Sequence, residues 1–119
     1  MSDGLRTKYD DPMYRLLRDG KVQAFNEEKA RGTAIDLVNC DFRAIDLRDL
    51  DADGLDLSGC YFRQSDLRGI DFSHCNLEGA SIHSAKISGA LFPTGLSAAE
   101  IELSLLHGSR MRYNTTNKG

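Results

Sequence analysis

The sequence is poor in residues that support a covalent or membrane-bound framework. Its 119 residues include three cysteines, an odd number that argues against a disulfide framework. No apolar run approaches the about 18 residues that a membrane span requires, and residues 1–20 lack the basic start and apolar stretch of a signal peptide. From these absences and from the chain length, we expect one cytoplasmic domain with no membrane partner.

Motifs for catalysis, metal binding and nucleic-acid recognition are also missing. The chain has no HExxH, no CxxC and no glycine-rich phosphate loop. His74, His83 and His107 fall on different sides or elements, so they do not form a ligand set. The net charge is −3, and no basic stripe with interleaved aromatic residues is present. We therefore expect no enzymatic activity, no cofactor, no metal site and no direct nucleic-acid binding.

What the sequence does contain is an apolar residue at every fifth position between residues 35 and 92. Two places before each of these centres stands a second apolar or small residue, and the residue between the two is Asp at seven of the twelve places. Glycine recurs two places after a centre, as at Gly54 and Gly59, where we expect a turn with positive φ. The twelve centres are Leu37, Phe42, Leu47, Ala52, Leu57, Phe62, Leu67, Phe72, Leu77, Ile82, Ile87 and Phe92.

A period of five fits neither a helix nor a flat strand, because either element would scatter these side chains over all its faces. A coil resolves the pattern. If each five-residue unit forms one side of a coil, its centre and the residue two places earlier both point inward. A fixed period repeated in tandem is the signature of a solenoid, in which stacked units bury a core that no single unit can bury alone.

These residues resemble the pentapeptide-repeat family, whose consensus is similar to A(D/N)LXX, over about half of the chain. The resemblance implies an all-β solenoid, a right-handed quadrilateral β-helix with four units in each turn. Twelve units then predict three coils, roughly 14 Å tall at the spacing of paired strands. Residues one coil apart stack, which places Cys40 near Cys60. We expect both to be packed core thiols, since inward cysteines of a cytosolic protein rarely form bridges.

The segments on either side of the repeats are expected to close its ends. The sequence predicts three parts: an N-terminal tail and helical cap (1–33), the β-helix (34–94), and a C-terminal helix with a polar tail (95–119). Asp11 and Pro12 read as the start of a helix that stops at Gly20. A second amphipathic turn, 21–31, contains a Val-x-x-Phe-Asn stretch similar to the Val-x-x-Trp-Asn element that precedes the repeats in this family. Caps of this kind cover exposed backbone groups and bare core.

The C-terminal helix begins with a capping box, Ser97-Ala-Ala-Glu100, and ends before Gly108. It carries two apolar stripes, whereas a helix that only caps its own coil needs one. The second stripe indicates a homodimer through this helix. The alternative is that Met111, Tyr113 or the N-terminal helices fold back over that stripe. The candidate dimer residues are Ile101, Leu103, Leu105 and Leu106.

Charge placement gives the remaining indication of function. Stacking by coils places one group of carboxylates on two adjacent sides, and Arg43, Arg48, Arg63 and Arg68 on the other two. We expect a rigid protein-binding scaffold whose partner the sequence does not identify. The alternative is a DNA mimic that binds DNA gyrase or topoisomerase, as the quinolone-resistance members of the family do. The candidate acidic face consists of Asp36, Asp51, Asp53, Asp56, Asp71 and Glu78.

Overall fold

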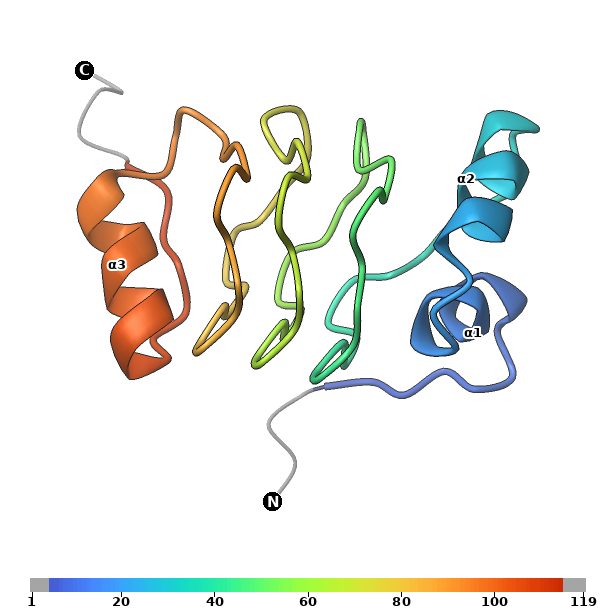
Figure 1. Cartoon of the computed structure of the whole chain (residues 1–119), viewed down its shortest axis with the longest axis horizontal. Helices are drawn as coiled ribbons and strands as arrows, with labels where there is room; N and C mark the ends of the chain where they lie inside the picture. Colours follow the sequence, from blue (N-terminus) through green and yellow to red (C-terminus); the bar gives the residue numbers. More distant parts are fainter. Residues whose placement is uncertain (1–4, 115–119) are drawn as a thin grey trace.

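The chain forms a stack of short loops that is closed by helices at both ends (Figure 1). The computed structural model describes residues 5–114 and measures 38 × 32 × 26 Å along its principal axes. Helices α1 (Pro12–Arg18) and α2 (Val22–Ala30) lie at one end of the stack, and α3 (Ala98–His107) lies at the other. The repeats therefore occupy the middle of the molecule.

A tight turn closes nearly every five-residue unit. The backbone N–H three residues after a centre donates to the carbonyl of that centre, as from Cys40 to Leu37 and from Leu55 to Ala52. At ten of the twelve units the residue two places after the centre has positive φ, as a type II turn requires. The expectation of positive φ at the repeat glycines is confirmed, with φ of 77° at Gly54 and 71° at Gly59. Glycine reaches this conformation without steric cost.

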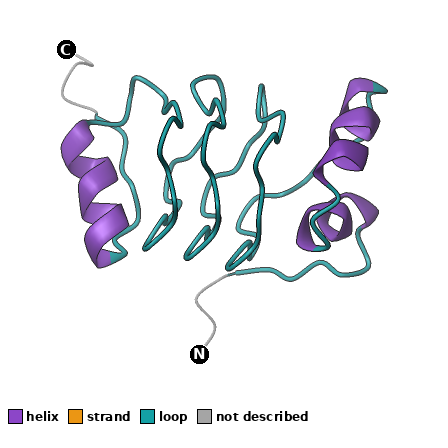
Figure 2. Cartoon of the chain, viewed as in Figure 1, coloured by secondary structure: helices purple, strands orange, loops and turns teal. Residues whose placement is uncertain are grey.

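Successive coils pair through isolated parallel β-bridges between residues one coil apart, including Asp41 with Tyr61 and Asp46 with Asp66. Neighbouring backbone bonds, such as Phe42 N to Tyr61 O at 2.8 Å, follow the same register of twenty residues. No continuous strand forms within residues 5–114, and the coils pair through isolated bridges instead (Figure 2). The physical reason is that a turn interrupts the ladder every five residues.

The core is a set of stacked columns. Ten of the twelve centres are buried, and Ile87 and Phe92, near the last turn, are partly buried against the same core. The rings of Phe42 and Phe62 are stacked with centroids 5.7 Å apart, and those of Phe72 and Phe92 are 6.0 Å apart. Aromatic stacking adds to the area buried by each column, so the fixed register has an energetic basis.

The N-terminal part completes the exposed edge of the first coil. Asp11 caps α1 as predicted, because its carboxylate accepts a hydrogen bond from Met13 N. Tyr14 then extends an aromatic column, with its ring 5.3 Å from that of Phe42. Before α1, the segment at Arg6 forms a parallel bridge with Cys40, so an extended piece of chain also pairs with this edge.

Asn26 of α2 closes a different stretch of the same edge. Its side-chain amide donates to Asp49 O at 2.8 Å and accepts from Asp51 N at 2.9 Å. The amide thus imitates the backbone of a missing coil. Phe25, the residue beside it, is fully buried where the family element carries tryptophan.

The C-terminal part closes the opposite edge. Ser97 caps α3 by accepting from Glu100 N at 3.1 Å, and Gly108 ends the helix with φ of 79°, both as the sequence predicted. Met111 is fully buried and exchanges backbone hydrogen bonds with Gly79 and Ala80 in the last coil. The residues after α3 therefore pair with the repeats, as a further coil would.

Candidate functional site

The predicted acidic face is partly neutralised in the structure. Asp36 forms ion pairs with Arg6 at 3.0 Å and with Lys8 at 3.3 Å, and Asp51 forms one with Lys29 at 3.2 Å. The side-chain hydrogen bond from Arg6, together with that from Lys8, lowers the pKa of Asp36 to about 2. Both basic partners of Asp36 come from the segment before α1. These two carboxylates therefore hold the N-terminal part to the coils.

The other four residues of the face remain without a Lys or Arg partner within residues 5–114. The carboxylate of Asp53 lies 3.7 Å from His74 Nδ1, and Glu78 accepts a hydrogen bond from Tyr113 N at 3.3 Å. Asp56 and Asp71 accept hydrogen bonds from the backbone N–H two residues later, at 3.1 and 2.9 Å. The candidate acidic surface thus reduces to these four exposed carboxylates.

The recurring aspartate has a local role that explains its frequency. At the position before a centre, its carboxylate accepts from the N–H of the residue after that centre and so fixes the entry to the turn. Asparagine does the same where it replaces aspartate. The residues that make this bond are Asp41, Asp46, Asp51, Asp56, Asp66, Asp71 and Asn76.

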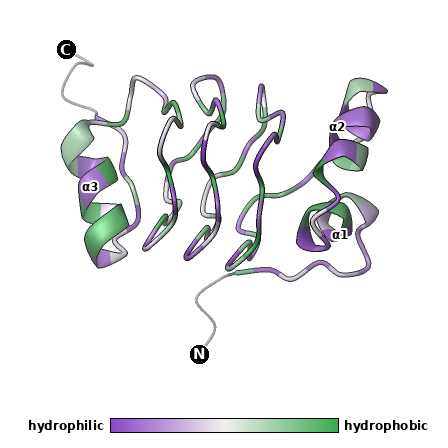
Figure 3. Ribbon diagram, in the orientation of Figure 1, coloured by the Kyte–Doolittle hydropathy of each residue, from purple (hydrophilic) through white to green (hydrophobic). Residues whose placement is uncertain are grey.

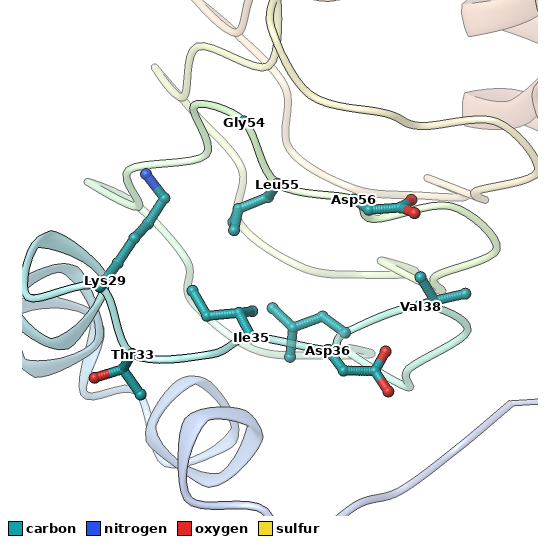
Figure 4. A pocket seen from close by; sticks show the side chains of 10 residues that line it. Lys29, Thr33, Ile35, Asp36, Val38, Gly54, Leu55 and Asp56 are labelled. Carbon is teal, nitrogen blue, oxygen red and sulfur yellow. The ribbon is translucent and has the colours of Figure 1, made fainter.

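A recess of about 600 Å³ lies where the end of α2 meets the first coils (Figure 4). Lys29, Asp36 and Asp56 supply its charges, and Ile35 and Leu55 lie between them. Lys29 and Asp36 are already engaged in ion pairs. Within residues 5–114, no group of three or more His, Cys, Asp or Glu is placed to hold a metal ion. The recess therefore offers an uneven polar surface and no converging catalytic groups.

The arginine-bearing sides consist mainly of paired charges. Arg48 and Arg68 lie one coil apart and bind Asp46 and Asp66, each at 2.6 Å, while Arg48 Nε also reaches Asp66 at 3.3 Å. The result is a ladder of alternating charge across two coils. The hydrogen bond from Arg68 holds the pKa of Asp66 well below its usual range. This ladder contributes little net charge to the surface.

A second arginine cluster surrounds Tyr61. The guanidinium carbons of Arg43 and Arg63, which the sequence predicted to stack, lie 5.9 and 5.6 Å from the centroid of the ring. Arg110 lies nearer, at 4.8 Å, and the sequence analysis did not identify it because it stands outside the repeats. The sequence feature that could have helped is the periodicity. It stacks residue 63 on residue 83 and so identifies the side of the coils that an arginine from the C-terminal part could cover.

The predicted dimer residues divide into two pairs. Ile101 and Leu105 are partly buried against the core, whereas Leu103 and Leu106 have exposed fractions of 43% and 57%. Figure 3 shows the apolar colour on α3 at the end of the stack. Met111 packs on the coil and leaves these two leucines uncovered in the described chain. The exposed pair is the part of the predicted stripe that a partner can contact.

Stacked units with a common register, a shared core and capped ends define a solenoid repeat protein of the β-helix type. The sequence model described as pentapeptide repeats matches residues 33–64 and 56–92, in eight copies. The chain therefore belongs to the pentapeptide-repeat family. Proteins of this family are generally structural or binding proteins.

Comparison with curated proteins and with solved structures gives no match. None of the helices within residues 5–114 is both long and apolar enough to cross a membrane.

Proposed function

We propose that the protein is a non-enzymatic scaffold that binds another protein, built on a right-handed quadrilateral β-helix of three coils. Twelve units at four to a turn support the coil number, and the twenty-residue register of the bridges is in keeping with it. Closed ends and stacked core columns hold the outward side chains on a fixed backbone. Three free, buried thiols accord with a reducing cytoplasm, where the proposal places the protein.

The observation that carries this proposal is the exposed leucine pair on α3. Leu103 and Leu106 are three residues apart and so lie on the same helical face. An apolar face that stays exposed on the end helix of a solenoid is stabilised when another molecule covers it. A second copy of the chain is the occupant we propose, because two-fold pairing of the same patch is the commonest form of association. The dimer would then present the outward sides of one longer rod to a partner.

Charge mimicry of DNA remains the second candidate, and one observation favours it. Asp53, Asp56, Asp71 and Glu78 are exposed and have no Lys or Arg partner in the part of the chain that the structure describes. Against it, duplex DNA carries one charge per roughly 1.7 Å, a density that four carboxylates on about three coils do not reach. Topoisomerase binding is therefore the alternative outcome of the same experiment.

Affinity capture from a lysate of the source cell distinguishes the two functions. The wild-type protein is compared with a charge-reversal variant, Asp53→Lys with Asp71→Lys, and with a helix variant, Leu103→Ser with Leu106→Ser. If the protein is a scaffold, wild type and the charge-reversal variant capture the same protein in nearly equal amounts. If wild type captures topoisomerase subunits and the charge-reversal variant does not, the scaffold function is wrong and DNA mimicry takes its place. If no protein is enriched relative to an unrelated bait protein of similar size, both functions are rejected.

A further inference from the structure

A small recess beside the Tyr61 cluster differs from the others in the chemistry of its lining. It has a volume of about 190 Å³ and is lined by Arg43, Arg63, Gln64 and His83. Three larger recesses of the described chain each have at least two carboxylates in their lining. In an acidic chain, a recess lined by nitrogen-bearing side chains and no carboxylate selects for an anion.

Arg63 brings a positive charge to this recess that no carboxylate offsets. Arg43 forms an ion pair with Asp41 at 2.7 Å, whereas Arg63 forms none with any residue among 5–114. Its guanidinium instead faces the ring of Tyr61. A guanidinium that lies on an aromatic face keeps its N–H groups available at the edge of its plane.

Arg110 adds a further charge to the same neighbourhood. Its Nη1 donates to the carbonyls of Gly59 at 3.1 Å and Gly79 at 2.6 Å, which are neutral acceptors. Among the described residues no carboxylate pairs with Arg110. Two cations near one ring repel each other, so an anion bound between or beside them is stabilised.

His83 contributes an incomplete polar contact at the edge of the recess. Its Nδ1 is buried and has no hydrogen-bond partner among the residues that the structure describes. Buried polar atoms are otherwise paired in folded proteins, so this nitrogen marks a place where the chain does not complete its own network. The end of α3 fixes the position of the ring. A Cβ added at Gly108 would lie 3.4 Å from His83 Cγ and 3.5 Å from Arg63 Nη2.

We propose that this recess binds the oxyanion of a phosphate group. The planar fork of Arg63 matches two phosphate oxygens, while the Gln64 amide supplies a further nitrogen donor. Arg110 adds to the positive field around the recess, whereas the charge of Arg43 is offset by Asp41. The recess is large enough to hold a phosphate group. The binding site depends neither on dimerisation through α3 nor on a protein partner.

The test is an NMR titration of the ¹⁵N-labelled full chain at neutral pH and constant ionic strength. The probes are inorganic phosphate, a short phosphoserine peptide and the same peptide without phosphate. We expect saturable shifts at the amides of residues 63, 64 and 83 with the two phosphate probes. Arg63→Gln weakens this binding by about tenfold or more, because a charge-assisted hydrogen-bond pair is lost. Arg68→Gln, the same change one unit later, is the matched control and leaves the binding unchanged.

The two phosphate probes distinguish the source of the group. Tighter binding of the phosphoserine peptide identifies a phosphorylated protein as the ligand, and equal binding identifies free phosphate. Non-saturable shifts, or equal weakening by Arg63→Gln and Arg68→Gln, overturn the proposal because they show only charge screening. The amide spectrum of each variant reports folding. If Arg63→Gln fails to fold, Arg63→Lys, which keeps the charge and removes the fork, must weaken phosphate binding in its place.

Discussion

At the scale of single residues, the repeat assigns different chemistry to neighbouring positions. Asp56, before a centre, uses its carboxylate to fix the turn, whereas the exposed carboxylate of Asp53, after a centre, lies 3.7 Å from His74 Nδ1. Identical side chains therefore have structural or surface roles according to their place in the unit. The inward cysteines show the same principle, because burial determines their reactivity.

Burial protects the three thiols from modification in the folded protein. It raises the pKa of Cys40 to about 11 and that of Cys75 to about 12, and it also raises the pKa of Cys60. The reactive thiolate is then scarce at pH 8. We expect Ellman's reagent to label the native protein very slowly at pH 8 and to label three thiols promptly in 6 M guanidinium chloride. Prompt labelling of even one thiol before unfolding contradicts this assignment.

At the scale of elements, the caps work by imitating a coil. Asn26 supplies a donor and an acceptor to the backbone of Asp49 and Asp51, and the backbone of Met111 does the same at the other end. An open solenoid edge is otherwise a row of unpaired backbone groups. The stability of the repeats consequently depends on residues outside them.

Asn26→Ala tests the cap on α2. The substitution removes two hydrogen bonds at the partly exposed edge of the first coil, and we expect it to lower the free energy of unfolding by about 1–2 kcal/mol. Urea denaturation monitored by circular dichroism measures the change. Gln23→Ala, on an exposed position of the same helix, is the control and is expected to have almost no effect. Equal effects of the two substitutions would show that the amide pairing is not stabilising.

The segment at Arg6 makes stability depend on pH. Its hydrogen bond lowers the pKa of Asp36 to about 2, below the ordinary value of 3.8. The ion pair therefore stabilises the fold above about pH 4, and that contribution is lost as the pH falls through 2. Because the Asp36 side chain is 59% exposed, solvent screening keeps the contribution below about 1 kcal/mol.

Comparison of wild type with Asp36→Asn checks this dependence. We expect a higher urea midpoint for wild type at pH 7 and a difference that disappears near pH 2. Asp10→Asn, at an exposed position nearby, is the control and should match wild type at both values. If the difference in urea midpoint between wild type and Asp36→Asn grew on acidification, the ion pair of Asp36 would not be the source of the pH dependence.

At the scale of the whole molecule, one end differs from the other. Helices α1 and α2 cover the first coil, with Tyr14 and Phe25 fully buried, whereas α3 leaves Leu103 and Leu106 exposed. The C-terminal end is therefore where association is expected. Dimerisation there would place the two N-terminal caps at opposite ends of a longer rod.

Light scattering after size exclusion tests this association. We expect wild type to elute with the mass of a dimer, and Leu103→Ser with Leu106→Ser to elute as a monomer with an unchanged circular dichroism spectrum. Leu91→Ser is the matched control, because Leu91 is an equally exposed leucine outside α3, with an exposed fraction of 57%. A monomeric wild type at high micromolar concentration contradicts the dimer.

The sequence by itself determined the five-residue repeat and the residues that cap α1 and α3. These follow from local causes: an apolar side chain every five residues, glycine where φ must be positive, and the caps at Asp11 and Ser97. Local patterns of this kind are visible in a single chain because each depends on residues a few positions apart. Within residues 5–114 the coils pair without a continuous strand, since the turns recur too closely.

Only the tertiary structure decided which charges and apolar groups remain available to a partner. Arg6 and Lys29 neutralise two carboxylates of the predicted acidic face, and Arg110 joins the cluster on Tyr61. Each of these contacts links the repeats to a segment outside them, with no fixed spacing that a pattern could reveal. The coil positions followed from periodicity, but the surface depended on how the non-periodic caps fold onto it.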